Sequence, residues 1–212
     1  MRIITISREF GSGGRELGKR MAELLGCAYY DREIITAIAR EDSLDERYVE
    51  KMMEGPSFMT YPITIGCTLS YPPYAKQNEI SILISQQRVM KKLAAKGDCV
   101  VMGQGADSIL NEYQPVKLFV YADMEAKIRR CQERRPKGEY LTVRELQREI
   151  VRVDLGRAKR YELITSSKWG NKENYHLCVN TTGIPIKALA PQMADYARFR
   201  FEREKQETSE IE

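Results

Sequence analysis

A glycine-rich segment near the N-terminus carries the strongest chemical signal in the sequence. The run Gly11–Gly14 follows a short apolar stretch over residues 2–7 and precedes a helix-like apolar pattern that ends at Leu25. A strand, a glycine turn and a helix in this order direct several backbone N–H groups, and the positive end of the helix dipole, toward one point. Glycine leaves that point open because it has no Cβ. This pattern predicts a site for phosphate.

The run matches only part of the phosphate-binding loop of nucleotide triphosphatases, whose pattern is G-x-x-x-x-G-K-[ST]. Gly11–Gly13 correspond to its glycine-rich stretch. Where the motif has lysine and then a hydroxyl residue, this chain has Gly14, Arg15 and Glu16. A strand-to-helix turn with a purely structural role is the alternative interpretation.

The missing lysine and the missing hydroxyl ligand each need a replacement if phosphate is bound. Arg15 is one candidate for the cation, because a guanidinium fork matches two phosphate oxygens, and Arg8 or a later arginine is another. No dedicated metal ligand is predicted, so magnesium would be held through Ser12, Glu16, water or the phosphate oxygens themselves.

A dense group of basic residues lies between positions 129 and 160. Phosphoryl transfer needs such positive charge, because in the transition state the transferring phosphoryl group carries negative charge on its three equatorial oxygens. Two helices joined at Pro136 and Gly138 would form a closing lid. Interleaved glutamates leave a solvated charged face as the alternative. The basic residues are Arg129, Arg130, Arg134, Arg135, Lys137, Arg148, Arg152, Arg157 and Arg160.

Several polar residues follow predicted strands or share a predicted helix. Asp31 ends the second strand and Gln104 follows the third, so both are expected at the carboxyl edge of a parallel sheet, where ligands bind. Helix capping is the alternative for Asp31. Asp154 and Arg157 are three residues apart on one helix, which fits either a weak surface ion pair or contacts to a ribose hydroxyl and a base or phosphate.

The elements that position these residues alternate between strand and helix, which predicts an α/β fold with a mainly parallel sheet covered on both faces. A capping box, Thr142 to Glu145, opens one of the helices. Proline and tyrosine residues over 54–74 predict a flap above the site. The strands are expected at 2–7, 27–30, 99–102, 117–121 and 176–179, and the helices at 13–25, 78–96, 123–134, from 142 and from 185.

Composition narrows the function classes. The chain has 212 residues, a net charge of +4, five scattered cysteines and one histidine, His176. A single histidine disfavours a histidine-rich metal site or a histidine-based triad, and an odd number of scattered cysteines indicates reduced thiols and the cytoplasm. The small net charge and the lack of a long apolar run predict neither a nucleic-acid nor a membrane partner. We expect one domain over 1–212, and a homo-oligomer is left open.

Taken together, these motifs resemble the cytidylate kinase-like family, a branch of the nucleoside monophosphate kinases. The resemblance runs from Ile3 to about Leu189. It rests on TISREFGSGGR at 5–15, YYDRE at 29–33, VVMG at 100–103, Asp154-x-x-Arg157, KWG at 168–170, and Tyr175 through to Asn180-Thr181.

The resemblance implies a three-layer P-loop NTPase fold with a five-stranded parallel sheet, helices on both faces and an arginine-rich helical lid. It also implies transfer of the γ-phosphoryl of ATP, with Mg2+, to a cytidylate-like nucleoside monophosphate or a similar small phosphate acceptor. ATP phosphates would be held by Gly11, Ser12, Gly13, Gly14, Arg15 and Glu16. Transfer is assigned to Arg15, Arg130 and Arg134, and acceptor binding to Arg8, Asp31, Gln104, Asp154 and Arg157.

Three departures separate the chain from cytidylate kinases proper. Gly14 replaces the loop lysine, Gln104 replaces an arginine, and the Arg-Asp pair before Asp-x-x-Arg is missing. A non-catalytic nucleotide-binding protein, such as a sensor, is therefore the second hypothesis.

Overall fold

The computed structural model describes residues 1–47, 49–50, 73–103, 105–135 and 141–209. Most of the predicted flap, Gln104 and the predicted hinge at Pro136 and Gly138 lie outside these residues.

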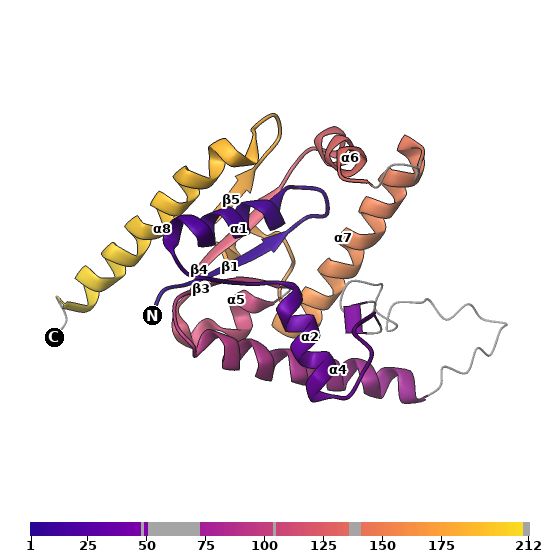
Figure 1. Cartoon of the computed structure of the whole chain (residues 1–212), viewed down its shortest axis with the longest axis horizontal. Coiled ribbons are helices and arrows are strands. Elements are labelled where there is room, and N and C mark those ends of the chain that lie inside the picture. The colour runs from indigo at the N-terminus through magenta and orange to yellow at the C-terminus, as the bar shows by residue number, and fades with distance from the viewer. Residues whose placement is uncertain (48, 51–72, 104, 136–140, 210–212) are drawn as a thin grey trace.

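Five strands form one parallel sheet, as the sequence predicted (Figure 1). Their spatial order is β2-β3-β1-β4-β5, and every neighbouring pair is parallel. The first strand of the chain is therefore at the centre of the sheet, and its carboxyl end lies between its two neighbours, β3 and β4. The strands are β1 (Ile3–Arg8), β2 (Ala28–Tyr30), β3 (Cys99–Met102), β4 (Val116–Tyr121) and β5 (Leu177–Asn180).

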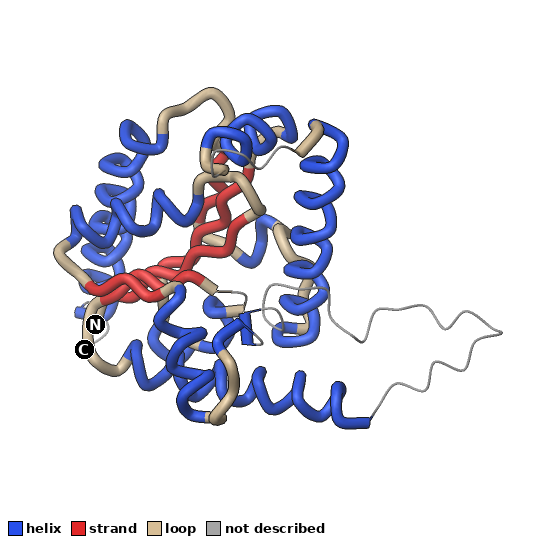
Figure 2. The backbone as a smooth tube through the Cα atoms, turned by 45° about the vertical axis from the view of Figure 1, so that its right-hand side comes forward, coloured by secondary structure: helices blue, strands red, loops and turns tan. Residues whose placement is uncertain are grey.

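Helices connect the strands and lie on both sides of the sheet (Figures 1 and 2). Helix α4 begins at Pro73, five residues before the predicted start, because proline is well suited to the first position of a helix. The helices are α1 (Gly14–Leu25), α2 (Arg32–Glu41), α4 (Pro73–Ala94), α5 (Ala106–Ile109), α6 (Met124–Glu133), α7 (Val143–Thr165) and α8 (Ile186–Ser209), with short 3-10 turns η2 (Asn111–Tyr113) and η3 (Lys172–Asn174).

Alternating side chains along the strands fill two separate cores. Ile4 and Ile6 of β1 face α1 and α8, whereas Ile3 faces the layer formed by α2, α4 and α5. Because successive strand residues point to opposite faces, one short apolar strand serves both cores. The three-layer α/β architecture is confirmed.

Helix α7 runs along the side of the molecule and packs against α6 (Figure 1). Its start has the predicted capping box, in which Thr142 and Glu145 satisfy each other's backbone N–H groups. Further along, the Tyr161 hydroxyl donates to the Asp107 carboxylate at 2.7 Å, beside the ring of Tyr175. These contacts fix α7 to α5 and to the segment before β5.

The single histidine predicts a stability change between neutral and mildly acidic pH. The Nδ1 atom of His176 accepts from the backbone N–H of Lys117 at 3.1 Å, which requires that nitrogen to be unprotonated. Burial, and then the charges of Arg200 and Lys117, lower the pKa of His176. A lowered folded-state pKa gives stability above the unfolded pKa of about 6.5 that is lost as the pH falls through and below that value.

We therefore expect the free energy of unfolding to fall between pH 7 and pH 5, measured by urea titration. The side chain is exposed, so screening keeps the fall below about 1 kcal/mol. In His176→Asn, which keeps an acceptor but does not titrate, this part of the slope should vanish. An unchanged slope in the variant would assign the effect to other groups.

Candidate phosphate-binding site

The loop between β1 and α1 turns sharply at the carboxyl end of the central strand. Gly11 has φ of 76° and Gly13 has φ of 85°, and Gly13 is the N-cap of α1. Both values lie in the left-handed region, which glycine adopts at little cost. The loop therefore ends at a helix N-terminus, which is the geometry that favours an anion.

The loop glycines are also required by the packing of the loop against its own protein. A Cβ on Gly13 would lie 2.6 Å from Cδ1 of Ile186, in α8. A Cβ on Gly11 would lie 3.0 Å from Sγ of Cys131 and from the carbonyl oxygen of Lys127, both in α6. The sequence argument, based on phosphate approach alone, missed this second reason for glycine.

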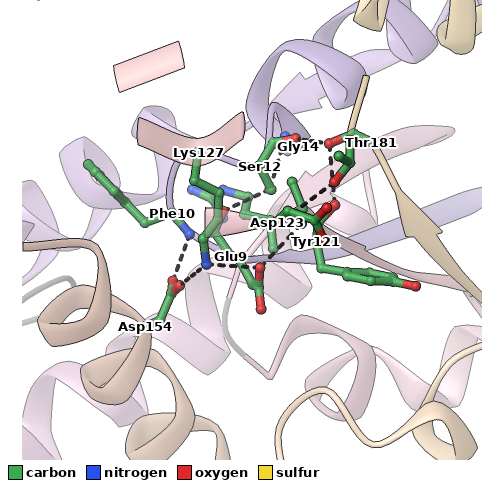
Figure 3. Close-up of polar contacts among 12 residues, drawn as sticks. Glu9, Phe10, Ser12, Gly14, Tyr121, Asp123, Lys127, Asp154 and Thr181 are labelled. Atoms are coloured by element: carbon green, nitrogen blue, oxygen red, sulfur yellow. Dashed lines mark hydrogen bonds and ion pairs between the residues drawn. The ribbon is translucent and has the colours of Figure 1, made fainter. Parts of the chain in front are cut away.

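Ser12 is fully buried and serves the loop itself. Its hydroxyl donates to the carbonyl of Glu9 at 2.8 Å. Its own carbonyl accepts from the Thr181 hydroxyl at 2.6 Å (Figure 3). The same carbonyl accepts from Nη1 of Arg130 at 3.2 Å. Arg130 also donates to the carbonyl of Thr181 at 2.6 Å. The backbone at Ser12 is therefore fixed from α6 and from the segment after β5.

A buried lysine lies on the other side of the loop. Nζ of Lys127 is 3.0 Å from Oε2 of Glu9 and 3.0 Å from Oδ2 of Asp154 (Figure 3). Oδ1 of Asp154 accepts from the backbone N–H of Phe10 at 2.6 Å. Burial opposes the charge on Lys127, but the hydrogen bonds and charges of Asp154 and Glu9 outweigh it, so the pKa of Lys127 is raised. This triad connects α6 and α7 to the loop.

The predicted acceptor residues Asp154 and Arg157 thus both contact the loop. Nη1 of Arg157 donates to the carbonyl of Arg8 at 2.9 Å, and its guanidinium lies 5.8 Å from the ring centroid of Phe10. Oδ1 of Asp154 accepts from the backbone N–H of Phe10 in the loop, and Oδ2 of Asp154 accepts from Nζ of Lys127. A contact with substrate stays a prediction for this pair.

Asp31 joins two arginines at the carboxyl end of β2. Oδ1 of Asp31 is 3.2 Å from Nη2 of Arg8, and Oδ2 is 2.5 Å from Nε of Arg15. Asp31 is the N-cap residue of α2, but its side chain makes no capping hydrogen bond. The helix-capping alternative is therefore wrong for this side chain, which instead orients the two arginines.

A cavity of about 340 Å³ opens between the loop and α6. Among the described residues that line it, Glu9 is the only acid. Burial, followed by the charges of Arg134 and Arg129, lowers the pKa of Arg130, although a guanidinium stays protonated. Mutual repulsion of this kind favours a bound polyanion. The arginines that line the cavity are Arg8, Arg15, Arg130, Arg134, Arg135 and Arg157.

Among the described residues of the predicted arginine lid, Arg130 and Arg157 contact the loop and the end of β1, and Arg160 is buried. The other five divide into two sets. Arg134 pairs with Glu16 of α1 at 2.6 Å, and Arg135 pairs with Glu149 of α7 at 2.8 Å, so these residues connect α6 to its neighbours. Arg129, Arg148 and Arg152 are exposed and do not line the cavity, as the solvated-face alternative expects.

The loop and cavity fit nucleotide phosphates better than they fit a metal held by the protein. The described residues contain no group of three or more His, Cys, Asp or Glu side chains that could hold a metal ion. The Ser12 hydroxyl donates within the loop, and Glu16 is ion-paired with Arg20 and Arg134. No helix in the described parts of the chain has the length and apolar character needed to span a membrane.

A glycine loop that joins the central strand of a parallel α/β sheet to a helix N-terminus, beneath an arginine-lined cavity, defines the P-loop kinase class. The profile of the cytidylate kinase-like family matches residues 3–183, and the chain belongs to this family.

Solved structures show the same fold at low sequence identity. An uncharacterised protein from Eubacterium ventriosum ATCC 27560 is 21% identical, with a TM-score of 0.67 over 93% of this chain and 99% of that one. Shikimate kinase from Acinetobacter baumannii, in complex with shikimate, is 15% identical, with a TM-score of 0.53 over 94% of each chain. Shikimate kinase from Bacteroides thetaiotaomicron is 14% identical, with a TM-score of 0.55 over 93% of this chain and 98% of that one. No curated protein sequence matches the chain.

Proposed function

We propose that this protein is an ATP-dependent phosphotransferase that moves the γ-phosphoryl group to a nucleoside monophosphate, cytidylate or a close relative. One observation carries the proposal. The arginine-lined cavity opens directly onto the glycine loop at the N-terminus of α1, so a polyphosphate on the loop would lie among several guanidinium groups. Family membership supports the acceptor class.

The chain would act by positioning and by neutralising charge. An oxygen of the acceptor phosphate attacks the γ-phosphorus of ATP, the bond to the β–γ bridging oxygen breaks, and ADP leaves with that electron pair. The backbone N–H groups of Gly13 and Gly14 would orient the β- and γ-phosphates, that of Gly14 in exchange for its long hydrogen bond of 3.4 Å to the Ser12 hydroxyl. Arg130 on α6 and Arg134 at its C-cap would stabilise the equatorial charge of the transferring group, with Arg15 at the start of α1. Arg130 would do so while its guanidinium also holds the carbonyls of Ser12 and Thr181.

Magnesium would enter with the nucleotide, because the described residues provide no acidic cluster for it. When bound, it would neutralise charge on the β- and γ-phosphate oxygens. The acceptor would occupy the side of the cavity nearest Asp31 and Arg157. Gln104, also assigned to the acceptor, lies outside the described residues, so its role stays a prediction.

The test is ADP release in the presence of ATP, magnesium and one acceptor at a time. The panel contains CMP, dCMP, UMP and AMP, with shikimate as a small hydroxyl acceptor. We expect turnover with a pyrimidine monophosphate and at least about a hundredfold loss of kcat in Arg130→Ala, because a transition-state arginine contributes that much or more. The neighbouring Arg129→Ala, on the exposed side of α6, should keep full activity.

No turnover with any acceptor, from protein that melts cooperatively, would contradict the proposed reaction. The second hypothesis would then apply, since Gly14 stands where the motif has its lysine. A non-catalytic nucleotide-binding protein should still gain about 2.7 kcal/mol of stability when ATP is present at one hundred times its Kd. Thermal melting with and without ATP separates the two functions.

A further inference from the structure

At two positions of the phosphate loop, glycine and the basic residue are interchanged relative to the motif. The pattern G-x-x-x-x-G-K places its two glycines five positions apart and its lysine directly after the second. When Gly13 is taken as the second glycine, the first glycine position falls on Arg8 and the lysine position falls on Gly14. The chain therefore has a cation where the motif has glycine, and glycine where the motif has the cation.

The structure shows why these two positions are linked. A Cβ built on Gly14 would lie 2.8 Å from Cβ of Arg8, 3.3 Å from Cβ of Val120 and 3.4 Å from Cδ of Arg8, so Arg8 makes the closest contact and Val120 a milder one. The Arg8 side chain thus crosses the place from which a side chain at position 14 would start. The Cβ of Arg8 cannot move without its backbone, so a contact of 2.8 Å between the two Cβ atoms cannot be relieved by a rotation of the side chain. A residue larger than glycine at position 14 is therefore incompatible with Arg8.

The guanidinium of Arg8 is presented to the cavity from a rigid element. Arg8 is the last residue of β1, and its carbonyl is held by Arg157 at 2.9 Å. Its side chain is 10% exposed, lines the cavity, and is held by Asp31 at 3.2 Å. Arg15, the other candidate, shares Asp31 but has a side chain that is 51% exposed.

We infer that Arg8 is the phosphate-binding cation of this loop in place of the lysine, that Gly14 is glycine so that Arg8 can cross it, and that Asp31 orients Arg8 until phosphate binds. The inference rests on the proposed function and deepens it, since it assigns the missing cation to one residue. A guanidinium can grip two oxygens of one phosphate, which an ammonium group cannot.

The test restores glycine at position 8 and lysine at position 14, first one at a time and then together. Arg8→Gly should weaken ATP binding at least tenfold, measured by isothermal titration calorimetry, and Arg8→Gln, which keeps a side chain over Gly14, should do the same. Gly14→Lys alone should also bind ATP weakly, because the new Cβ meets Arg8. The double variant Arg8→Gly/Gly14→Lys restores the standard motif, and its Kd should return to within about threefold of the unaltered protein.

The matched control is Arg2→Gly, at the residue that precedes the opposite end of the same strand. Arg2 is likewise ion-paired with an aspartate, Asp98, at 2.6 Å, but it lies away from the cavity. Its loss should leave the Kd for ATP unchanged, with thermal melting used to confirm that every variant folds.

Each outcome decides a separate point. Unchanged ATP affinity in Arg8→Gln, or a double variant that binds no better than Arg8→Gly, would overturn the inference while leaving the proposed function intact. If the unaltered protein binds no ATP, both fall. Tight binding without turnover contradicts the proposed reaction alone.

Discussion

Replacing Lys127 with methionine should lower the free energy of unfolding by about 3 kcal/mol. The substitution removes the cation between Glu9 and Asp154 and leaves two carboxylates facing each other in a largely buried place. Breaking a buried ion pair from one side costs about 3–5 kcal/mol, because the remaining charge loses its compensation without regaining water. The lower end applies because the side chain of Glu9 is partly exposed.

Urea denaturation measures this loss, and Lys92→Met is the matched control. Lys92 pairs with Glu41 at the same 3.0 Å distance, but its side chain is 63% exposed. Its loss should change stability by less than about 0.5 kcal/mol. Adding Glu9→Gln and Asp154→Asn to Lys127→Met should recover at least half of the loss, since neither carboxylate charge then remains. No recovery would show that the lysine acts by packing rather than by charge.

Replacing Gly13 with alanine should abolish ATP binding at concentrations that saturate the unaltered protein. The residue has φ of 85°, where an L side chain costs about 1–2 kcal/mol. The new Cβ would also lie 2.6 Å from Cδ1 and 2.9 Å from Cγ1 of Ile186, a buried residue, so either that side chain or the loop must shift. A shift of the loop misdirects the N–H groups at the start of α1.

Gly26→Ala separates the two effects. Gly26 caps the other end of α1 with φ of 64°, and nothing lies within 4 Å of a Cβ built there. This variant should lose similar stability through strain alone and keep its affinity for ATP, both followed by calorimetry. In Gly13→Ala, a second substitution, Ile186→Ala, should restore part of the binding. Equal loss of ATP binding in Gly13→Ala and Gly26→Ala would contradict the steric explanation.

The fold could be predicted because its signals are local. Each buried strand is a short apolar run between helical patterns, and the observed strands begin and end within one residue of the predicted ones. The capping box at Thr142 and the glycines around α1 also act over a few residues, so their patterns survive without tertiary information. The start of α4 was misplaced because Pro73 was assigned to the flap rather than to a first helical position.

The site was only partly predictable, because its decisive contacts join distant positions. The loop and several cavity arginines were found from the sequence. The role of Lys127 was not, because Lys127 and Glu9 are 118 residues apart and no spacing rule connects them. Asp154 was interpreted through its spacing from Arg157, whereas its observed partners are Lys127 and Phe10. The signal available in advance was limited to the two acids, since Glu9 and Asp154 lie within the segments that carry the family resemblance and Lys127 lies outside them.

The way the loop is anchored has a consequence for how the protein is made. Ser12 is held by the Thr181 hydroxyl, 169 residues later in the chain, and Gly13 lies against Ile186. During synthesis, the first strand and its loop leave the ribosome long before these anchors do. The phosphate-binding loop proposed for ATP would therefore be among the last features to form on a nascent chain, and ATP could act as a folding ligand only after the segment beyond β5 has emerged.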